Sequence, residues 1–205
     1  TTTVVGSGIM ADRLAAGNVA VALLANTAAT AAALLVLIRT LGPISGAHLN
    51  PVVTVAETFT DRFPHRIALL FLIAQSIGAI AGSLLANAMF DLPLVQISTK
   101  LRVTPGSLLS EIVATAGLLF VIRKSDASSV ASHVALYIAS AYWFTASTSF
   151  ANPAVTLGRV FTDTFAGIAP ASALGFIPAQ IIGAILGILL HKILSNKASP
   201  KSDTP

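Results

Sequence analysis

The stretch 45–54, Ser-Gly-Ala-His-Leu-Asn-Pro-Val-Val-Thr, decides the fold of this chain, because a second Asn-Pro pair at 152–153 follows Ser-Phe-Ala in a similar setting. Each pair comes after a long hydrophobic run and opens a segment that is too short to cross a bilayer alone. Paired short segments, each interrupted by Pro, at corresponding positions of two halves indicate a membrane conduit lined by two half-helices.

The composition of the chain indicates that lipid is its solvent. Of the 205 residues 55% are hydrophobic and only 10% are charged, with a mean hydropathy of +0.84. Soluble domains usually carry about 25% charged residues. The net charge of +4 is scattered between apolar runs and forms no basic face, so nucleic acid is excluded as a partner. The absence of Cys excludes disulfides, a thiolate nucleophile and a Cys-based metal site.

Long apolar runs predict membrane-crossing helices at 18–38, 67–90, 107–122, 132–147 and 174–194, and Gly42-Pro43 is expected to break the chain after the first of them. The segment 1–10 is apolar but supplies only about half of the roughly 20 residues that a crossing needs. We therefore expect the sequence to begin inside a first transmembrane helix. The prediction is an all-α membrane protein with six transmembrane helices, the first truncated, and two reentrant half-helices.

Internal similarity predicts an inverted repeat. Residues 74–80 match residues 179–185 at six of seven positions. We expect a single transmembrane channel domain over 1–205, with a first repeat at 1–90 and a second at 107–194. Each repeat would hold an odd number of crossings, so the two would be oppositely oriented in the membrane. Small residues expected on helix-packing faces are Gly78, Gly82, Gly183 and Gly187.

Lys and Arg are unevenly divided between the two sides that six crossings define. One side carries Arg39, Arg62, Arg66, Arg123, Lys124, Lys192, Lys197 and Lys201. The other carries Arg13, Lys100, Arg102 and Arg159. Positive charge concentrates in cytoplasmic loops. We therefore expect both termini, the polar tail 195–205 and the first Asn-Pro loop on the cytoplasmic side of the inner (plasma) membrane.

An Asn-Pro pair suits the start of a half-helix at membrane depth. Asn50 and Asn152 can cap the helix, and Pro51 and Pro153 fit its first position, where the missing N–H costs nothing. About ten residues rise roughly 15 Å, half of a ~30 Å hydrocarbon core, so two such segments from opposite sides meet near the midplane. Their facing N-termini repel cations, while the Asn amides still donate hydrogen bonds to a neutral solute. Carbonyls expected to form acceptor ladders are those of Gly46, Ala47, His48, Ser149, Phe150 and Ala151.

These residues resemble the aquaporin (major intrinsic protein) family. The resemblance rests on 45–54, on Asn-Pro-Ala at 152–154, on the Ala-Gln-x-Ile-Gly-Ala repeat and on Glu111, and it covers nearly the whole chain. It implies six helices and two half-helices that form one pore in each monomer, a homotetramer, and passage of water or of water with small neutral solutes. Val52 stands where the family has Ala, a small change in volume behind the Asn pair.

The main departure from the family lies at the outer constriction. The family usually places Arg directly after the second Asn-Pro-Ala (152–154), where this chain has Val155, and the resemblance puts the other members of the filter at Thr30, Ser140 and Ser149. Such a filter is small and neutral, shows no narrow neck and lacks a rigid fork of charged donors. Protons should still be blocked by the half-helix fields and the Asn pair. Arg159, one helical turn beyond Val155, is either a substitute or an anchor for the half-helix end near the outer surface.

Two further polar residues are expected to support the loops. Glu111 lies within a span, where a carboxylate is costly and usually has a task, and we expect it to accept backbone N–H bonds from the second loop. The family has a matching Glu early in the first helix, and its absence from 1–10 is read as truncation. His48 either has a related role at the first loop or simply packs within it.

The expected function is passive conduction of water and small neutral solutes, with arsenous acid or other metalloid hydroxides among them, because bacterial channels that resemble this one at Val155 are associated with arsenite movement. A glycerol or urea facilitator and a water-selective channel are alternatives. A coupled secondary transporter would need carboxylates at depth, for which Glu111 and Glu57 are candidates. A non-conducting structural protein is a further alternative. An enzyme is disfavoured, because the four His form no metal-binding motif and the Ser residues lack a base; no cofactor, metal or catalytic residue is expected.

Overall fold

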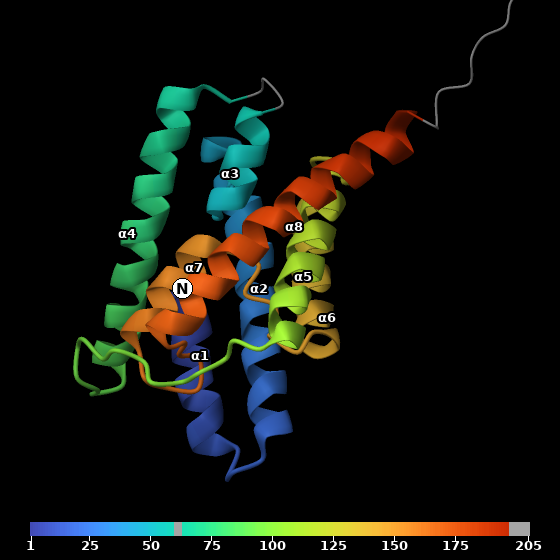
Figure 1. Cartoon of the computed structure of the whole chain (residues 1–205). Coiled ribbons are helices and arrows are strands. Elements are labelled where there is room, and N and C mark those ends of the chain that lie inside the picture. The colour runs from blue at the N-terminus through green and yellow to red at the C-terminus, as the bar shows by residue number, and fades with distance from the viewer. Residues whose placement is uncertain (60–62, 197–205) are drawn as a thin grey trace, which may run out of the picture.

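A computed structural model describes residues 1–59 and 63–196 of the chain. The described residues form α-helices and one short 3-10 helix and contain no strand (Figure 1). In chain order the elements are α1 (Thr2–Leu14), α2 (Val19–Ser45), α3 (Pro51–Thr58), α4 (His65–Met89), α5 (Pro105–Lys124), α6 (Val130–Phe144), α7 (Pro153–Gly158), η1 (Arg159–Phe161) and α8 (Pro170–Asn196). The all-α prediction is confirmed, with α3 and α7 as the two half-helices.

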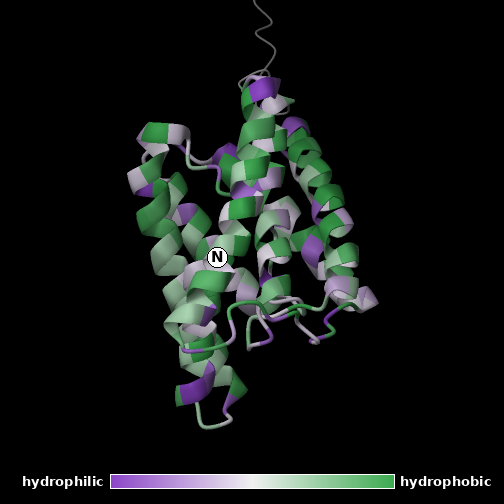
Figure 2. Ribbon diagram, turned by 90° about the vertical axis from the view of Figure 1, so that its left-hand side faces the viewer, coloured by the Kyte–Doolittle hydropathy of each residue, from purple (hydrophilic) through white to green (hydrophobic). Residues whose placement is uncertain are grey.

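The longer helices have the length and composition of membrane spans. Within the described residues, α2, α4, α5 and α8 are long and apolar enough to cross a bilayer, and α6 is a shorter apolar helix. Apolar residues predominate along the helices in Figure 2, and polar residues gather at turns and loops. Many large apolar side chains on these helices are exposed, among them Leu24, Leu70 and Ile185, which suits contact with lipid.

Helix contacts in the first half have counterparts in the second. Helix α1 packs on α2 and α4, as α5 packs on α6 and α8. Each half-helix contacts the long helix of its own half and that of the other half, since α3 touches α4 and α8 and α7 touches α8 and α4. The two half-helices also contact each other. This exchange places both Asn-Pro starts in the interior of the bundle.

The expected break at Gly42-Pro43 is wrong, because α2 continues through Pro43 to Ser45. Proline deprives only the carbonyl four residues earlier of its helical partner, and that residue, Arg39, lies in an exposed last stretch of the helix. The helix stops instead at Gly46, whose φ of 76° is left-handed and whose N–H bonds the carbonyl of Gly42 at 2.9 Å. Glycine adopts this conformation without steric cost.

The last helix also starts earlier than the apolar run 174–194 suggested. Helix α8 begins at Pro170, contains Pro178 and runs to Asn196. The expected tail at 195–205 therefore begins with two helical residues, and its remainder lies outside the described part of the chain. Arg62, Lys197 and Lys201, which were counted in the expected charge asymmetry, also lie outside the described residues.

Glycine lets α5 and α8 approach closely. A Cβ atom at Gly183 would lie 2.5 Å from the carbonyl oxygen of Ile112 and 2.9 Å from the Cβ atom of Thr115. Gly187 meets α5 in the same way, one turn later. A Cβ atom at Gly82 would lie 3.0 Å from the backbone nitrogen and the hydroxyl of Thr2 on α1, whereas one at Gly78 would face open space. Three of the four expected packing positions thus lie at helix contacts, and Gly78 does not.

Candidate functional site

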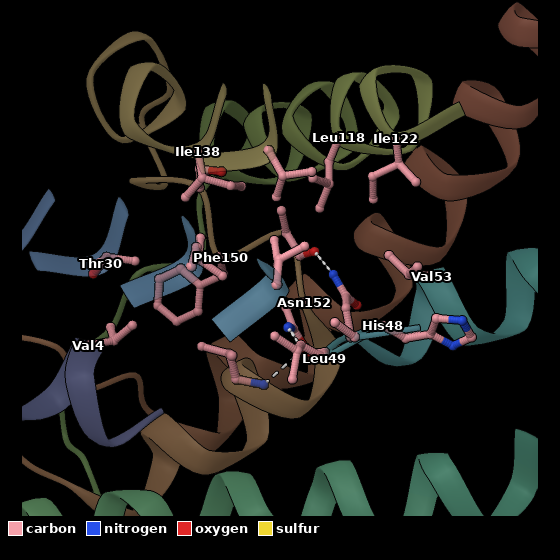
Figure 3. Close-up of a pocket in the computed structure, with 18 of the residues that line it drawn as sticks. Val4, Thr30, His48, Leu49, Val53, Leu118, Ile122, Ile138, Phe150 and Asn152 are labelled. Carbon is pink, nitrogen blue, oxygen red and sulfur yellow. Dashed lines mark hydrogen bonds between the residues drawn. The ribbon is translucent and has the colours of Figure 1, made fainter. Parts of the chain in front are cut away.

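A cavity of about 360 Å³ lies beside the two half-helices and is lined from Glu57, near the end of α3, to Arg159, at the start of η1. Apolar side chains of α2, α5 and α6 form one wall, and the loops before the half-helices form the other. In Figure 3, Leu118 and Ile138 lie across the cavity from Asn152. The full lining is Val4, Thr30, Leu34, Ile38, Gly46, Ala47, His48, Leu49, Asn50, Val53, Glu57, Leu118, Ile122, Val130, Val134, Ile138, Tyr142, Ser149, Phe150, Ala151, Asn152, Val155 and Arg159.

Asn50 and Asn152 both line this cavity, and each binds the loop that precedes the other half-helix. The Nδ2 atom of Asn50 donates to the carbonyl of Ala151 at 2.8 Å, and that of Asn152 donates to the carbonyl of Leu49 at 2.8 Å. Their Oδ1 atoms cap the half-helices, accepting from the N–H of Val52 at 3.1 Å and of Ala154 at 3.0 Å. Each amide group has a second N–H, which leaves a donor for a solute.

The loops before the half-helices have an unusual backbone conformation. Ala47 and Leu49 have φ values of 46° and 51°, and Ser149 and Ala151 have 50° and 46°. A left-handed conformation is uncommon for residues with a side chain and costs energy, so such a loop persists only when its surroundings hold it. The residues whose carbonyls were expected to form acceptor ladders all line the cavity: Gly46, Ala47, His48, Ser149, Phe150 and Ala151.

Glu111 holds the second loop. It is fully buried, and its two carboxylate oxygens accept from the backbone N–H of Phe150 at 2.9 Å and of Ala151 at 2.8 Å. Gln180 on α8 donates to the same carboxylate at 2.6 Å and to the hydroxyl of Thr156 at 2.8 Å. The carboxylate is thus engaged with the loop and does not line the cavity.

The first loop has a related but different support. Gln75 on α4 donates to the hydroxyl of Thr54 at 3.0 Å, matching the Gln180 contact in the other half. The Nδ1 atom of His48 lies 3.1 Å from the same hydroxyl, and its ring packs against Phe63 and Phe71. His48 both lines the cavity and packs within the loop, so the two expectations for it are not exclusive.

The remaining residues of the Asn-Pro motifs lie behind the pore. Pro51, Val52 and Pro153 line a separate apolar pocket of about 320 Å³ toward α8. Ala154 is buried with an exposed fraction of 3% and is absent from the cavity lining. These residues shape the half-helix starts and leave contact with solute to the two Asn side chains.

Three of the four expected filter residues, Thr30, Ser149 and Val155, line the cavity. The expectation for Ser140 is wrong, because its side chain is exposed on α6, bonds the carbonyl of Tyr137 at 2.7 Å and lies outside the cavity lining. Residues two positions apart point to different sides of a helix. The cavity-facing positions on α6 are Val130, Val134, Ile138 and Tyr142, and the spacing of four between the first three, which are apolar, is a signal that the sequence contains.

The Arg159 end of the cavity therefore has larger side chains, and more charge, than the small neutral filter that the sequence suggested. Tyr142 and Phe150 bring two aromatic rings to it, and the hydroxyl of Tyr142 lies 3.4 Å from that of Thr30. Arg159 also lines the cavity, with an exposed fraction of 3%. The sequence suggested Arg159 either as a substitute for the missing Arg or as an anchor of the half-helix end, and neither ring was expected there.

A clasp of polar contacts ties the α4–α5 connection to the segment after η1, at the lower end of Figure 1. The Asp163 carboxylate accepts from the backbone N–H of Thr99 at 2.9 Å, and this hydrogen bond holds the pKa of Asp163 below its ordinary value of 3.8. Arg102 donates to the carbonyls of Gly167 and Phe165 at 2.6 and 2.7 Å. These contacts fasten the α4–α5 connection to residues 163–167, which follow η1.

An ion pair lies at the opposite end of the cavity. Arg123, in the last turn of α5, lies 3.2 Å from the carboxylate of Glu57 and donates to the carbonyl of Ala56 at 3.1 Å. It therefore binds the C-terminal end of α3, where the helix dipole favours a cation. The carboxylates considered for ion coupling, Glu111 and Glu57, are both engaged in these contacts.

Comparison with known proteins agrees with this geometry. The family described as major intrinsic protein matches residues 2–126. Aquaglyceroporin AqpS of Rhizobium meliloti is 50% identical over 200 residues, which cover 96% of this chain and 85% of the relative. The probable aquaporin AqpM of Archaeoglobus fulgidus is 33% identical over 184 residues, covering 82% of this chain and 73% of the relative.

The fold has a counterpart among solved structures. The X-ray structure of the aquaglyceroporin from Plasmodium falciparum superposes with a TM-score of 0.68, covering 96% of this chain and 92% of that one at 21% identity. At this identity the likeness concerns the fold. Together with the paired Asn caps and the cavity beside them, the sequence relatives establish a passive channel for water and small solutes, and the chain belongs to the major intrinsic protein family.

Proposed function

We propose that the cavity conducts water together with small uncharged solutes that carry several hydroxyl groups, such as glycerol and arsenous acid. One observation carries the proposal: a polar stripe, made of the loop backbone at 46–49 and 149–151 and the amides of Asn50 and Asn152, faces a wall of mostly apolar side chains from α2, α5 and α6. A neutral polyhydroxyl solute can exchange its water for this stripe on one side and leave apolar groups on the other. An ion would lose its hydration on the apolar side without compensation.

The filter composition supports passage of solutes larger than water. Thr30, Ser149 and Val155 contribute short side chains to the outer half of the cavity. Val155, in the first turn of α7, has a much shorter side chain than the Arg that the family usually places there. The name aquaglyceroporin, given to the relative from Rhizobium meliloti, agrees with this breadth.

The experiment is a solute series in liposomes that contain the purified protein. Osmotic shrinkage reports water, reswelling reports glycerol and urea, and uptake at neutral pH reports arsenite. We expect glycerol and arsenite flux well above empty liposomes, linear in concentration and downhill. Arsenite flux equal to that of empty liposomes would remove this substrate, and saturable uptake driven by an ion gradient would indicate a coupled transporter.

Replacing Val155 tests its place in the filter. Val155→Arg should reduce glycerol and arsenite flux while sparing water, because the longer side chain fills the cavity beside Asn152. Val155→Ile is the matched control, since it adds volume without charge or donors. Unchanged discrimination between glycerol and water in Val155→Arg would exclude Val155 as a filter residue.

A water-selective channel is the second candidate, favoured by the crowding of Tyr142, Phe150 and Arg159 at the outer end. The same solute series separates the two, because a water-selective pore would shrink vesicles rapidly in glycerol without reswelling.

We further propose that the protein is a homotetramer in the inner (plasma) membrane with both termini in the cytoplasm, and that it acts without cofactor, metal or catalysis. The two-repeat division at 1–90 and 107–194 agrees with the matched helix contacts of the halves. Arg66 lies at the start of α4 and Arg123 in the last turn of α5, and both helix ends are toward the top of Figure 1, whereas the end of α1, with Arg13, is at the bottom. This division agrees with the expected charge asymmetry. Because the chain has no Cys, single-Cys variants labelled from one side report orientation, and light scattering in detergent reports the number of subunits.

A further inference from the structure

The position of Arg159 on its half-helix directs it into the cavity. It follows Val155 by four residues and Asn152 by seven, and residues at these spacings lie on one helix face. All three line the cavity, although α7 ends at Gly158 and Arg159 begins η1. The chain thus brings a guanidinium to the pore one turn farther out than the position that the family motif assigns.

Two contacts fix the guanidinium of Arg159. Its Nε atom donates to the carbonyl of Ala166, and its Cζ atom lies 3.5 Å from the centre of the Phe150 ring. That ring packs edge-on against Phe176, with 5.2 Å between centroids, and the backbone N–H of Phe150 is held by Glu111. Stacking on an aromatic face suits the planar guanidinium. The group is therefore held firmly beside the solute path.

The terminal nitrogens of Arg159 remain available. Within residues 1–59 and 63–196, they have no hydrogen-bond acceptor and no carboxylate within ion-pair distance. Burial of an unpaired charge is costly, so water or solute in the cavity must supply the missing acceptors. A guanidinium carries five N–H donors, and its Nε uses only one of them here.

We propose that Arg159 is the specificity-determining residue at the outer end of the pore, where its positive charge repels cations and its free N–H groups donate to the hydroxyl oxygens of passing neutral solutes. Phe150 and Tyr142 supply the apolar sides of this constriction. The inference rests on the proposed route through the cavity but not on arsenous acid as a substrate.

Arg102 provides a matched control. Both side chains donate to backbone carbonyls of the same segment, and both lie over the Phe150 ring, at 3.5 Å for Arg159 and 5.6 Å for Arg102. Only Arg159 lines the cavity. Replacing each by Met removes the charge and the carbonyl bonds but keeps most of the side-chain volume, so a purely structural role predicts the same effect at both sites.

The test measures potassium and proton leak in the vesicles used for water flux. Arg159→Met should raise the cation leak at least about tenfold, since a unit charge at close range in a site of low dielectric dominates the barrier, while water flux is retained. Arg102→Met should leave the leak at the wild-type level, and Arg159→Lys should restore exclusion. Equal leaks in Arg159→Met, Arg102→Met and wild type would overturn the proposal.

If Arg159→Met fails to assemble, Arg159→Lys tests the proposed role of Arg159. Lysine keeps the charge but lacks the rigid fork, so the ratio of glycerol to water flux should change at least about threefold. An unchanged ratio would overturn the proposal. If wild-type protein conducts neither water nor glycerol, the proposed route itself fails, and this outcome is distinct from a conducting wild type whose variants do not leak.

Discussion

Replacing Glu111 by Gln tests how the second loop is held, because the two side chains have nearly the same shape. The carboxylate accepts three hydrogen bonds, from the backbone N–H groups of Phe150 and Ala151 and from Gln180. The amide of Gln keeps one oxygen as an acceptor but replaces the other oxygen by an NH₂ group. That NH₂ group then faces N–H donors where it would need an acceptor. Gln180 can relieve its own share by turning its amide, since its Oε1 atom is buried without a partner.

The remaining cost falls on one backbone N–H, which loses its acceptor in a fully buried place. A buried unsatisfied donor costs about 1–3 kcal/mol, so we expect Glu111→Gln to lower the free energy of unfolding by about that amount. Loosening of the loop should also displace the carbonyls of Phe150 and Ala151, and water flux per folded channel should fall.

The assay is denaturant unfolding of the purified protein in detergent, followed by circular dichroism, with water flux measured in liposomes. Glu57→Gln is the control, because it removes the same charge from a partly exposed ion pair, where the loss is about 1 kcal/mol or less. If Glu111→Gln matched the wild type in both stability and flux, the three hydrogen bonds would not hold the loop, and the reasoning would be refuted.

Three other substitutions test separate features. Gly183→Ala should cost about 1–3 kcal/mol in the same unfolding assay, because its Cβ would lie 2.5 Å from the carbonyl of Ile112; Gly78→Ala, which faces open space, should cost far less, and equal losses would contradict close packing. Asn152→Asp should destabilise the protein by about 2–4 kcal/mol, since a carboxylate oxygen would face the carbonyl of Leu49; a stability equal to wild type would count against the paired-amide contact. Because the folded pKa of Asp163 is lowered, its stabilising effect is complete above pH 3.8 and lost as pH falls through the folded pKa, so wild type and Asp163→Asn should converge only below pH 3.8, and convergence near pH 5–6 would contradict this.

The half-helices were predictable because their starts are encoded locally. Asn50 and Asn152 each cap the helix that follows, and Pro51 and Pro153 each occupy its first position. Capping depends on a few adjacent residues, and two copies at matching positions of a repeat give the topology. The sequence alone is therefore enough to place the starts of both half-helices.

Positions on α6 and at the Arg159 end of the cavity were harder to predict, because they depend on the rotation of a helix about its axis and on contacts between distant segments. Ser140 and Tyr142 differ by two residues, and the packing of α6 against α2 and α5 decides that Tyr142 faces the cavity. The contribution of Phe150 follows from its ring leaning on Phe176, a contact between segments far apart in the chain. The predicted helix break at Pro43 was wrong for a related reason, because the effect of this proline on α2 depends on how near it lies to the helix end.

The reciprocal amide bonds between the two loops have a mechanical consequence. Asn50 binds the loop before α7, and Asn152 binds the loop before α3. Neither half-helix can therefore slide or tilt without stretching a hydrogen bond to the other. The spacing of the two Asn-bearing loops is therefore set by short hydrogen bonds inside the bundle and not by lateral pressure from lipid. Stretching the membrane should splay the outer ends of the long helices first, while the bore at its centre keeps its diameter.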